Sequence, residues 1–149
     1  MEIIVGRNPS NSEVQRSAEF EMISWLELQL DCKLSPKRVS VSDGVRLELD
    51  GFSQEPLIIC EAWAHQGTPK SAQKYKVMND AMKMVFTRMI IGTHARAILL
   101  FADEEAAKHF RGNTWQAAAL KANQIEIYVA ELSEVLLANI RRAQTNQYR

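Results

Sequence analysis

Two neighbouring extended segments place three carboxylates and one imidazole on the same side of an expected hairpin. Residues 45–50 alternate strictly between apolar and polar side chains, which indicates a half-buried strand, and residues 57–64 return after a turn at residues 53–56. Successive side chains of a strand point to opposite faces. We therefore expect one apolar face, made of Val45, Leu47, Leu49, Ile58, Cys60 and Ala62. The opposite face carries Glu48, Asp50, Ile59, Glu61, Trp63 and His65.

Asp50 and Glu61 are the pair with the clearest chemical use. Mg²⁺ or Mn²⁺ takes carboxylate oxygens and keeps several waters, so one or two acids suffice while a phosphate completes the shell. A metal held there polarises a phosphoryl oxygen and positions water for in-line attack. The alternative is a solvated hairpin face. Two observations count against a solvent-exposed face. Ile59 and Trp63 lie on that face, and helices are expected on both sides of the sheet.

Glu19 lies in a segment with the pattern of an amphipathic helix. Ser10 and Glu13 have the spacing of a capping box, and we expect a helix from there to about residue 30. Glu19 is in register with the apolar positions Ile23 and Leu26, so it lies along the buried stripe of that helix.

The rest of the chain alternates strands with helices. We expect a short strand at residues 39–41, a helix over residues 68–90 begun by Thr68 and Pro69, and a buried strand at residues 95–102. A helix broken near Gly112, a strand at residues 125–129 and a helix after Ser133 follow, with a polar tail after residue 142. These elements predict one α/β domain over residues 1–149, a three-layer α/β/α sandwich with a mixed sheet and a core at about residues 10–132.

The hairpin with its flanking helices resembles the restriction-endonuclease-like core of the PD-(D/E)xK nuclease superfamily. In that superfamily an aspartate ends one strand, and the next strand carries an acidic residue, any residue and then lysine. A glutamate on the first helix often assists. Asp50 matches the aspartate, Glu61 matches the acidic residue, and Glu19 matches the helix glutamate. The resemblance extends from about residue 10 to residue 132 and implies that Asp50 and Glu61, with Glu19, bind Mg²⁺ or Mn²⁺.

Trp63 departs from the pattern because it stands where the superfamily has lysine. Related families recruit a lysine from the following helix, which nominates Lys70, Lys74 or Lys76, and His65 is an alternative proton shuttle. Some members also place a glutamine on that helix to orient substrate or water. Gln73 occupies this region, and its spacing to the apolar positions of the helix directs it toward the sheet.

Composition excludes several other classes of protein. Basic and acidic side chains balance at 18 each, whereas a protein that coats DNA carries a basic surplus. The two cysteines form no CxxC pair, no glycine-rich phosphate loop follows a strand, and no Gly-x-Ser-x-Gly elbow is present. The start of the chain lacks the pattern of a signal peptide, and no apolar run could span a bilayer, so we expect a cytoplasmic protein.

Two functions fit these observations. The first is a Mg²⁺- or Mn²⁺-dependent nuclease acting on nucleic acid, DNA rather than RNA. The resemblance is compatible with a homodimer, and the short chain leaves sequence specificity low or supplied by a protein partner. The second is a nuclease fold without catalysis that serves in nucleic-acid binding or protein assembly, which Trp63 and the balanced charge favour.

Overall fold

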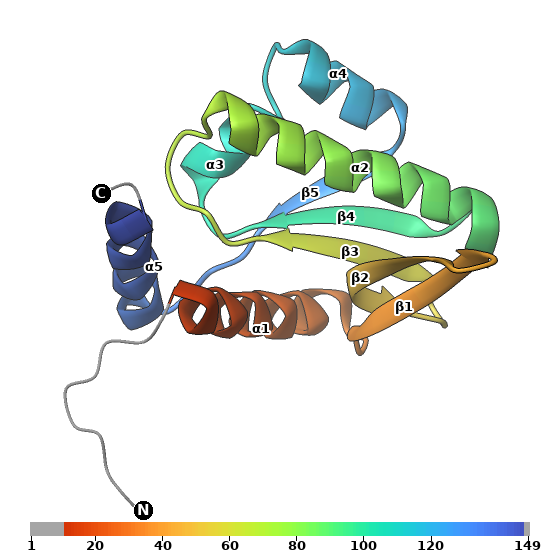
Figure 1. The fold of residues 1–149 in the computed structure, drawn as a ribbon, viewed down its shortest axis with the longest axis horizontal. Helices are drawn as coiled ribbons and strands as arrows, with labels where there is room; N and C mark the ends of the chain where they lie inside the picture. Colours follow the sequence, from red (N-terminus) through yellow and green to blue (C-terminus); the bar gives the residue numbers. More distant parts are fainter. Residues whose placement is uncertain (1–10, 148–149) are drawn as a thin grey trace, which may run out of the picture.

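The computed structural model describes residues 11–147, which form five helices and a single five-stranded sheet (Figure 1). The first half contains α1 (Asn11–Leu30), β1 (Ser35–Ser42), β2 (Val45–Ser53), β3 (Ile58–Trp63) and α2 (Ser71–Ile91). The second half contains β4 (Arg96–Phe101), α3 (Glu104–Lys108), α4 (Trp115–Ala122), β5 (Ile125–Val129) and α5 (Glu134–Gln147). The strands lie in the order β1-β2-β3-β4-β5, antiparallel from β1 to β3 and parallel from β3 to β5. The predicted α/β class with a mixed sheet is confirmed.

Helices cover both faces of the sheet and divide the core in two (Figure 1). On one face, Val77 and Met84 of α2 pack with Ile59 of β3 and with side chains of α3 and α4. On the other face, Met22 and Leu26 of α1 pack against further side chains of β3 and β4. Strand β4 contributes to both layers, which explains its unbroken apolar run. Within residues 11–147, no helix is both long enough and apolar enough to cross a membrane.

Several element boundaries differ from those predicted. Helix α2 begins at Ser71 with Lys70 as its N-cap, because the Gln73 side chain accepts a hydrogen bond from the Lys70 backbone N–H at 2.7 Å. Strand β1 is longer than residues 39–41, and α5 continues to Gln147 where a frayed tail was expected. The cap predicted at Ser10 lies outside the described residues.

The register of the hairpin corrects the expected assignment of its faces. Leu49 packs on the α2 side of the sheet together with Ile59, whereas Cys60 packs on the α1 side. The cause is a β-bulge. Ser35 pairs with Phe52 and Lys37 pairs with Leu49, so two residues of β2 lie opposite Pro36 alone. Proline has no N–H to give to the ladder, and the bulge accommodates this gap.

Helix α5 is attached to the β3–α2 loop through one buried glutamine. The Gln66 N–H donates to Gln144 Oε1 at 2.6 Å, and Gln144 Nε2 donates to the Gln66 carbonyl oxygen at 3.0 Å. Arg141 Nε donates to Gln66 Oε1 at 2.9 Å. The Gln66 residue is 6 % exposed whereas Arg141 is exposed, so these bonds are partly shielded from water.

Replacing Gln66 by alanine is expected to lower the free energy of unfolding by about 1–3 kcal/mol, because Arg141 loses a buried acceptor. Urea denaturation measures the loss, and amide exchange should become faster in α5 than in β4. Gln54→Ala, an exposed glutamine in the turn after β2, is the matched control and should change neither quantity. Unchanged exchange in α5 would contradict the assigned role of Gln66.

Candidate metal and phosphate site

Asp50 lies at the bulge, at the point where β2 separates from β3. The ladder between these strands ends at the pair Gly51 and Cys60. Beyond it, Asp50 Oδ2 accepts a hydrogen bond from the backbone N–H of Ala62 at 2.9 Å. The position of Gly51 is crowded, since an added Cβ would lie 3.3 Å from both Cys60 Cβ and Ile23 Cδ1. The bulge thus fixes the Asp50 carboxylate against β3 close to Glu61.

Glu61 is a buried carboxyl group on the α2 side of β3, with 4 % of the residue exposed. Lys83 of α2 brings its Nζ to 2.8 Å from Glu61 Oε1. The same ammonium donates to the Glu48 carbonyl oxygen at 2.8 Å and lies 3.9 Å from Asp80 Oδ1. Within the described chain, Oε1 is buried and its close contact with Lys83 lacks good hydrogen-bond geometry.

The charge balance around Glu61 is unfavourable for an ionised carboxylate. Burial is the largest cause and the negative charge of Asp50 adds to it, which together raise the pKa of Glu61 to about 9 although Lys83 opposes the shift. Among residues 11–147, Lys83 is the cation that opposes this shift, and the group keeps its proton at neutral pH. A second cation beside Asp50 and Glu61 would favour the ionised form.

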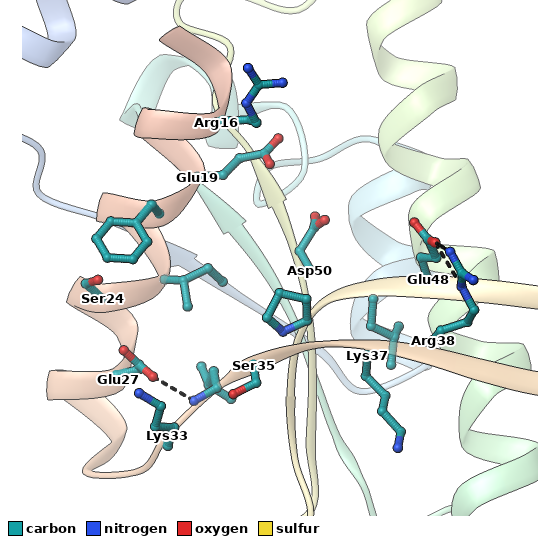
Figure 2. A pocket seen from close by; sticks show the side chains of 15 residues that line it. Arg16, Glu19, Ser24, Glu27, Lys33, Ser35, Lys37, Arg38, Glu48 and Asp50 are labelled. Carbon is teal, nitrogen blue, oxygen red and sulfur yellow. Dashed lines mark hydrogen bonds and ion pairs between the residues drawn. The ribbon is translucent and has the colours of Figure 1, made fainter. Parts of the chain in front are cut away.

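The negative charge of Asp50 also acts on two further acids, Glu19 and Asp80. Burial raises the pKa of Glu19 on α1, a hydrogen bond from Gln15 opposes the rise, and the charges of Asp50 and Asp80 add to it. Burial also raises the pKa of Asp80 on α2, where Lys83 opposes the rise and Asp50 adds to it. Figure 2 shows Glu19 and Asp50 at the same end of a groove beside α1. Acids from four elements thus act on one another around Asp50.

The residues present fit a hard divalent cation. Among residues 11–147, no three histidine, cysteine, aspartate or glutamate side chains already surround one point closely enough to hold a metal. Mg²⁺, however, commonly takes one or two carboxylates and completes its shell with water and substrate phosphate. Asp50 and Glu61 would supply these carboxylates, with Lys83 Nζ 2.8 Å from the buried Oε1 of Glu61.

The other residues predicted for the site lie at the N-terminal end of α2. Gln73 is buried, as its spacing indicated, but it caps the helix and lies 3.4 Å from His65 Nδ1. Lys70 acts electrostatically on His65, and Lys74 acts on His109. The structure therefore brings together Asp50, Glu61 and Glu19, and it places Gln73, Lys70 and Lys74 in a separate group.

Sequence reasoning missed Lys83 and Asp80. The buried stripe of α2 is Gln73, Val77, Ala81, Met84 and Thr87. Asp80 and Lys83 each directly adjoin a member of this stripe, so their charges are only partly exposed. Two charged residues beside a buried stripe are the signal that could have identified them, because a lone charge there needs a partner from the sheet.

Comparison with known proteins gave no match: no family model, curated protein or solved structure is significantly similar to this chain. The function must therefore be argued from the site.

Proposed function

We propose that this protein is a metal-dependent nuclease that hydrolyses phosphodiester bonds in nucleic acid, with DNA favoured over RNA by the resemblance described above. The observation that carries the proposal is the contact of Lys83 with Glu61 beside the Asp50 carboxylate. An aspartate and a glutamate on adjacent strands, with a lysine at hydrogen-bond distance, are the groups that the PD-(D/E)xK pattern requires. Trp63 stands where the pattern has its lysine, and Lys83 of α2 would supply the missing ammonium.

The order of elements supports the same proposal. Helix α1, the antiparallel strands β1 to β3, helix α2 and the parallel strand β4 follow one another as the restriction-endonuclease-like core would have them. The bulge places Asp50 where two strands separate, and bulges are common beside active sites because they redirect a side chain.

Asp50, Glu61 and Lys83 would have separate roles in the reaction. Asp50 and Glu61 would hold Mg²⁺ or Mn²⁺, and Glu19 lies close enough to Asp50 that the charge of Asp50 raises the pKa of Glu19. When bound, such an ion supplies Lewis-acid polarisation of the phosphoryl oxygen and activation of water. The oxygen of a water bonds to phosphorus, one ester P–O bond breaks, and the water's proton passes to the leaving alkoxide. Lys83 would stabilise the negative charge that develops on the phosphate.

A cleavage assay with matched variants tests the proposal. Supercoiled plasmid, single-stranded DNA and RNA are incubated with Mg²⁺ and then Mn²⁺. Wild type is expected to cleave at least one of them, and Asp50→Asn and Glu61→Gln should each lose about 100-fold or more, because each removes a metal ligand. Glu104→Gln, an exposed carboxylate of α3 paired with Arg111, is the control and should retain activity.

Absence of cleavage by a folded wild type would contradict the proposed nuclease activity. It would leave the alternative of a catalytically inactive nuclease-fold module for nucleic-acid binding or protein assembly. Cleavage that persists in both variants would place the chemistry elsewhere or in a contaminant. A homodimer, or a protein partner that supplies specificity, belongs to the same proposal and is tested by sedimentation of the active sample.

A further inference from the structure

Helix α2 is apolar on two opposite faces, and within residues 11–147 only one of these faces is covered. Its inner face packs on the sheet through the buried stripe described above (Figure 1). The outer face carries a second set of large apolar side chains, which we call the outer stripe: Tyr75, Met82, Phe86, Met89 and Ile90. Their spacing of seven, four, three and one residues keeps them on one side of a helix that turns every 3.6 residues. This side faces water.

The outer stripe exposes nearly as much apolar surface as one side of a stable protein interface requires. Tyr75, Met82 and Met89 are 71 %, 67 % and 73 % exposed, and Phe86 and Ile90 are each 41 % exposed. With about 200 Å² for an aromatic side chain and about 100 Å² for each of the others, the stripe presents roughly 400 Å². A standard interface buries about 800 Å² per partner, and a little more than half of this area is apolar. The stripe therefore matches the apolar part of one such interface.

The outer stripe is also symmetric about Met82, which suits a second copy of the same chain. Tyr75 lies seven residues before Met82, and Met89 lies seven residues after it. A two-fold axis at Met82 would pair two α2 helices in antiparallel orientation, with Tyr75 of each copy against Met89 of the other. Methionine sulfur makes favourable contacts with aromatic rings. The stripe is thus complementary to itself, as a two-fold interface must be.

The charges beside the outer stripe are compatible with this pairing, and the stripe itself carries none. Lys83 contacts Glu61 at 2.8 Å, and Arg88 donates to the Asn123 carbonyl oxygen, so both cations have partners in their own chain. Lys76 is exposed but lies six residues from the centre of the stripe. At 1.5 Å per residue, the two copies of this lysine would lie roughly 18 Å apart along the antiparallel helices. Salt screens charges beyond about 8 Å under physiological conditions.

We propose that two copies of this chain associate through the outer stripes of their α2 helices, antiparallel and centred on Met82. The inference goes beyond the proposed function, because it assigns the surface of a homodimer and requires neither metal nor nucleic acid. It is tested by association alone.

Sedimentation equilibrium of the full chain in EDTA, from about 1 to about 100 μM, measures the association. Wild type is expected to be mostly dimeric at the highest concentration. Met82→Glu places two carboxylates together at the two-fold axis and should weaken association about 100-fold or more. Leu28→Glu is the matched control, because it changes an apolar side chain of α1 that is 81 % exposed and lies outside the stripe. It should alter the affinity less than about 2-fold, and circular dichroism should show both variants folded.

An exchange of charges tests the antiparallel register. Tyr75→Lys and Met89→Glu should each weaken association about 10-fold, because each removes an apolar contact from the stripe. The double variant should associate at least about 5-fold more tightly than either single variant, since opposite charges then meet across the interface at both ends. Positions 75 and 89 lie roughly 21 Å apart within one helix, so the two charges cannot compensate each other inside a single chain.

The outcomes separate this inference from the proposed function. Wild type that stays monomeric at about 100 μM would overturn the inference and leave the stripe to a different partner. A dimer unaffected by Met82→Glu would place the interface elsewhere, and a double variant no tighter than the single variants would contradict the antiparallel register. A dimer that needs Met82 but shows no cleavage would uphold the interface and contradict the nuclease. Metal-dependent cleavage by a monomeric wild type would do the reverse.

Discussion

Replacing Lys83 by methionine is expected to reduce metal-dependent cleavage by about 100- to 1000-fold. The reason is the loss of a fixed ammonium that lies 2.8 Å from Glu61, since removing one preorganised donor to developing charge typically costs this much in rate. Methionine preserves most of the side-chain length and leaves the carboxylates in place. Initial rates of plasmid nicking under saturating Mg²⁺ provide the measurement.

The controls for Lys83→Met are two of the three lysines that the sequence had nominated. Lys70→Met and Lys74→Met change residues near His65 and His109, and each should alter cleavage less than 3-fold. The fold should tolerate Lys83→Met, because Glu61 without its cation keeps its proton and remains neutral. A rate loss in Lys74→Met with normal cleavage in Lys83→Met would assign the catalytic lysine to the start of α2.

Replacing Glu61 by glutamine is expected to stabilise the metal-free protein at alkaline pH. The pKa of Glu61 is about 9 in the folded chain, against an ordinary value of 4.5. Between these values the folded state binds more protons than the unfolded state, so wild type loses stability as pH rises through this window. Glutamine does not ionise and removes the loss. In EDTA at pH 8 we expect Glu61→Gln to be more stable by on the order of 3 kcal/mol.

Divalent metal should reverse the order of stability of wild type and Glu61→Gln. Mg²⁺ is expected to raise the melting temperature of wild type, because an ion that binds only the folded state stabilises it, and to leave Glu61→Gln unchanged. Thermal melts at pH 5 and pH 8, in EDTA and in Mg²⁺, measure both effects, and the two proteins should converge near pH 5. A Glu61→Gln protein that melts below wild type in EDTA at pH 8 would show that Glu61 is a structural ion-pair partner.

The sequence predicted the pair of acids because local alternation is sufficient to place them. Residues 45–50 alternate strictly and residues 57–64 are extended, and a turn at residues 53–56 sets a register that brings Asp50 close to Glu61. Strand β4 was similarly clear, since an unbroken apolar run bounded by turns fits few structures other than a buried strand. The class of the fold and the candidate acids follow from short-range pattern alone.

The bulge and the lysine could not be predicted in the same way, because each depends on a distant partner. The alternation of β2 carries no sign that Pro36 lies opposite, so it could not show that Leu49 faces α2 with Ile59. The pattern of α2 marked its buried stripe, but the direction of Lys83 depends on how that helix crosses β3. The sequence nominated lysines near the start of α2, whereas the ammonium that contacts Glu61 belongs to Lys83, further along the same helix.

Pro36 also bears on how the hairpin reaches a single native pairing. A regular ladder without an extra residue would shift one half of β2 by one position, which turns every side chain of that half to the opposite face. Such a shift would bury charged groups such as Glu48 and expose Leu47 and Leu49. Because proline has no N–H to donate, Pro36 disfavours a regular ladder at the position opposite Asp50 and Gly51.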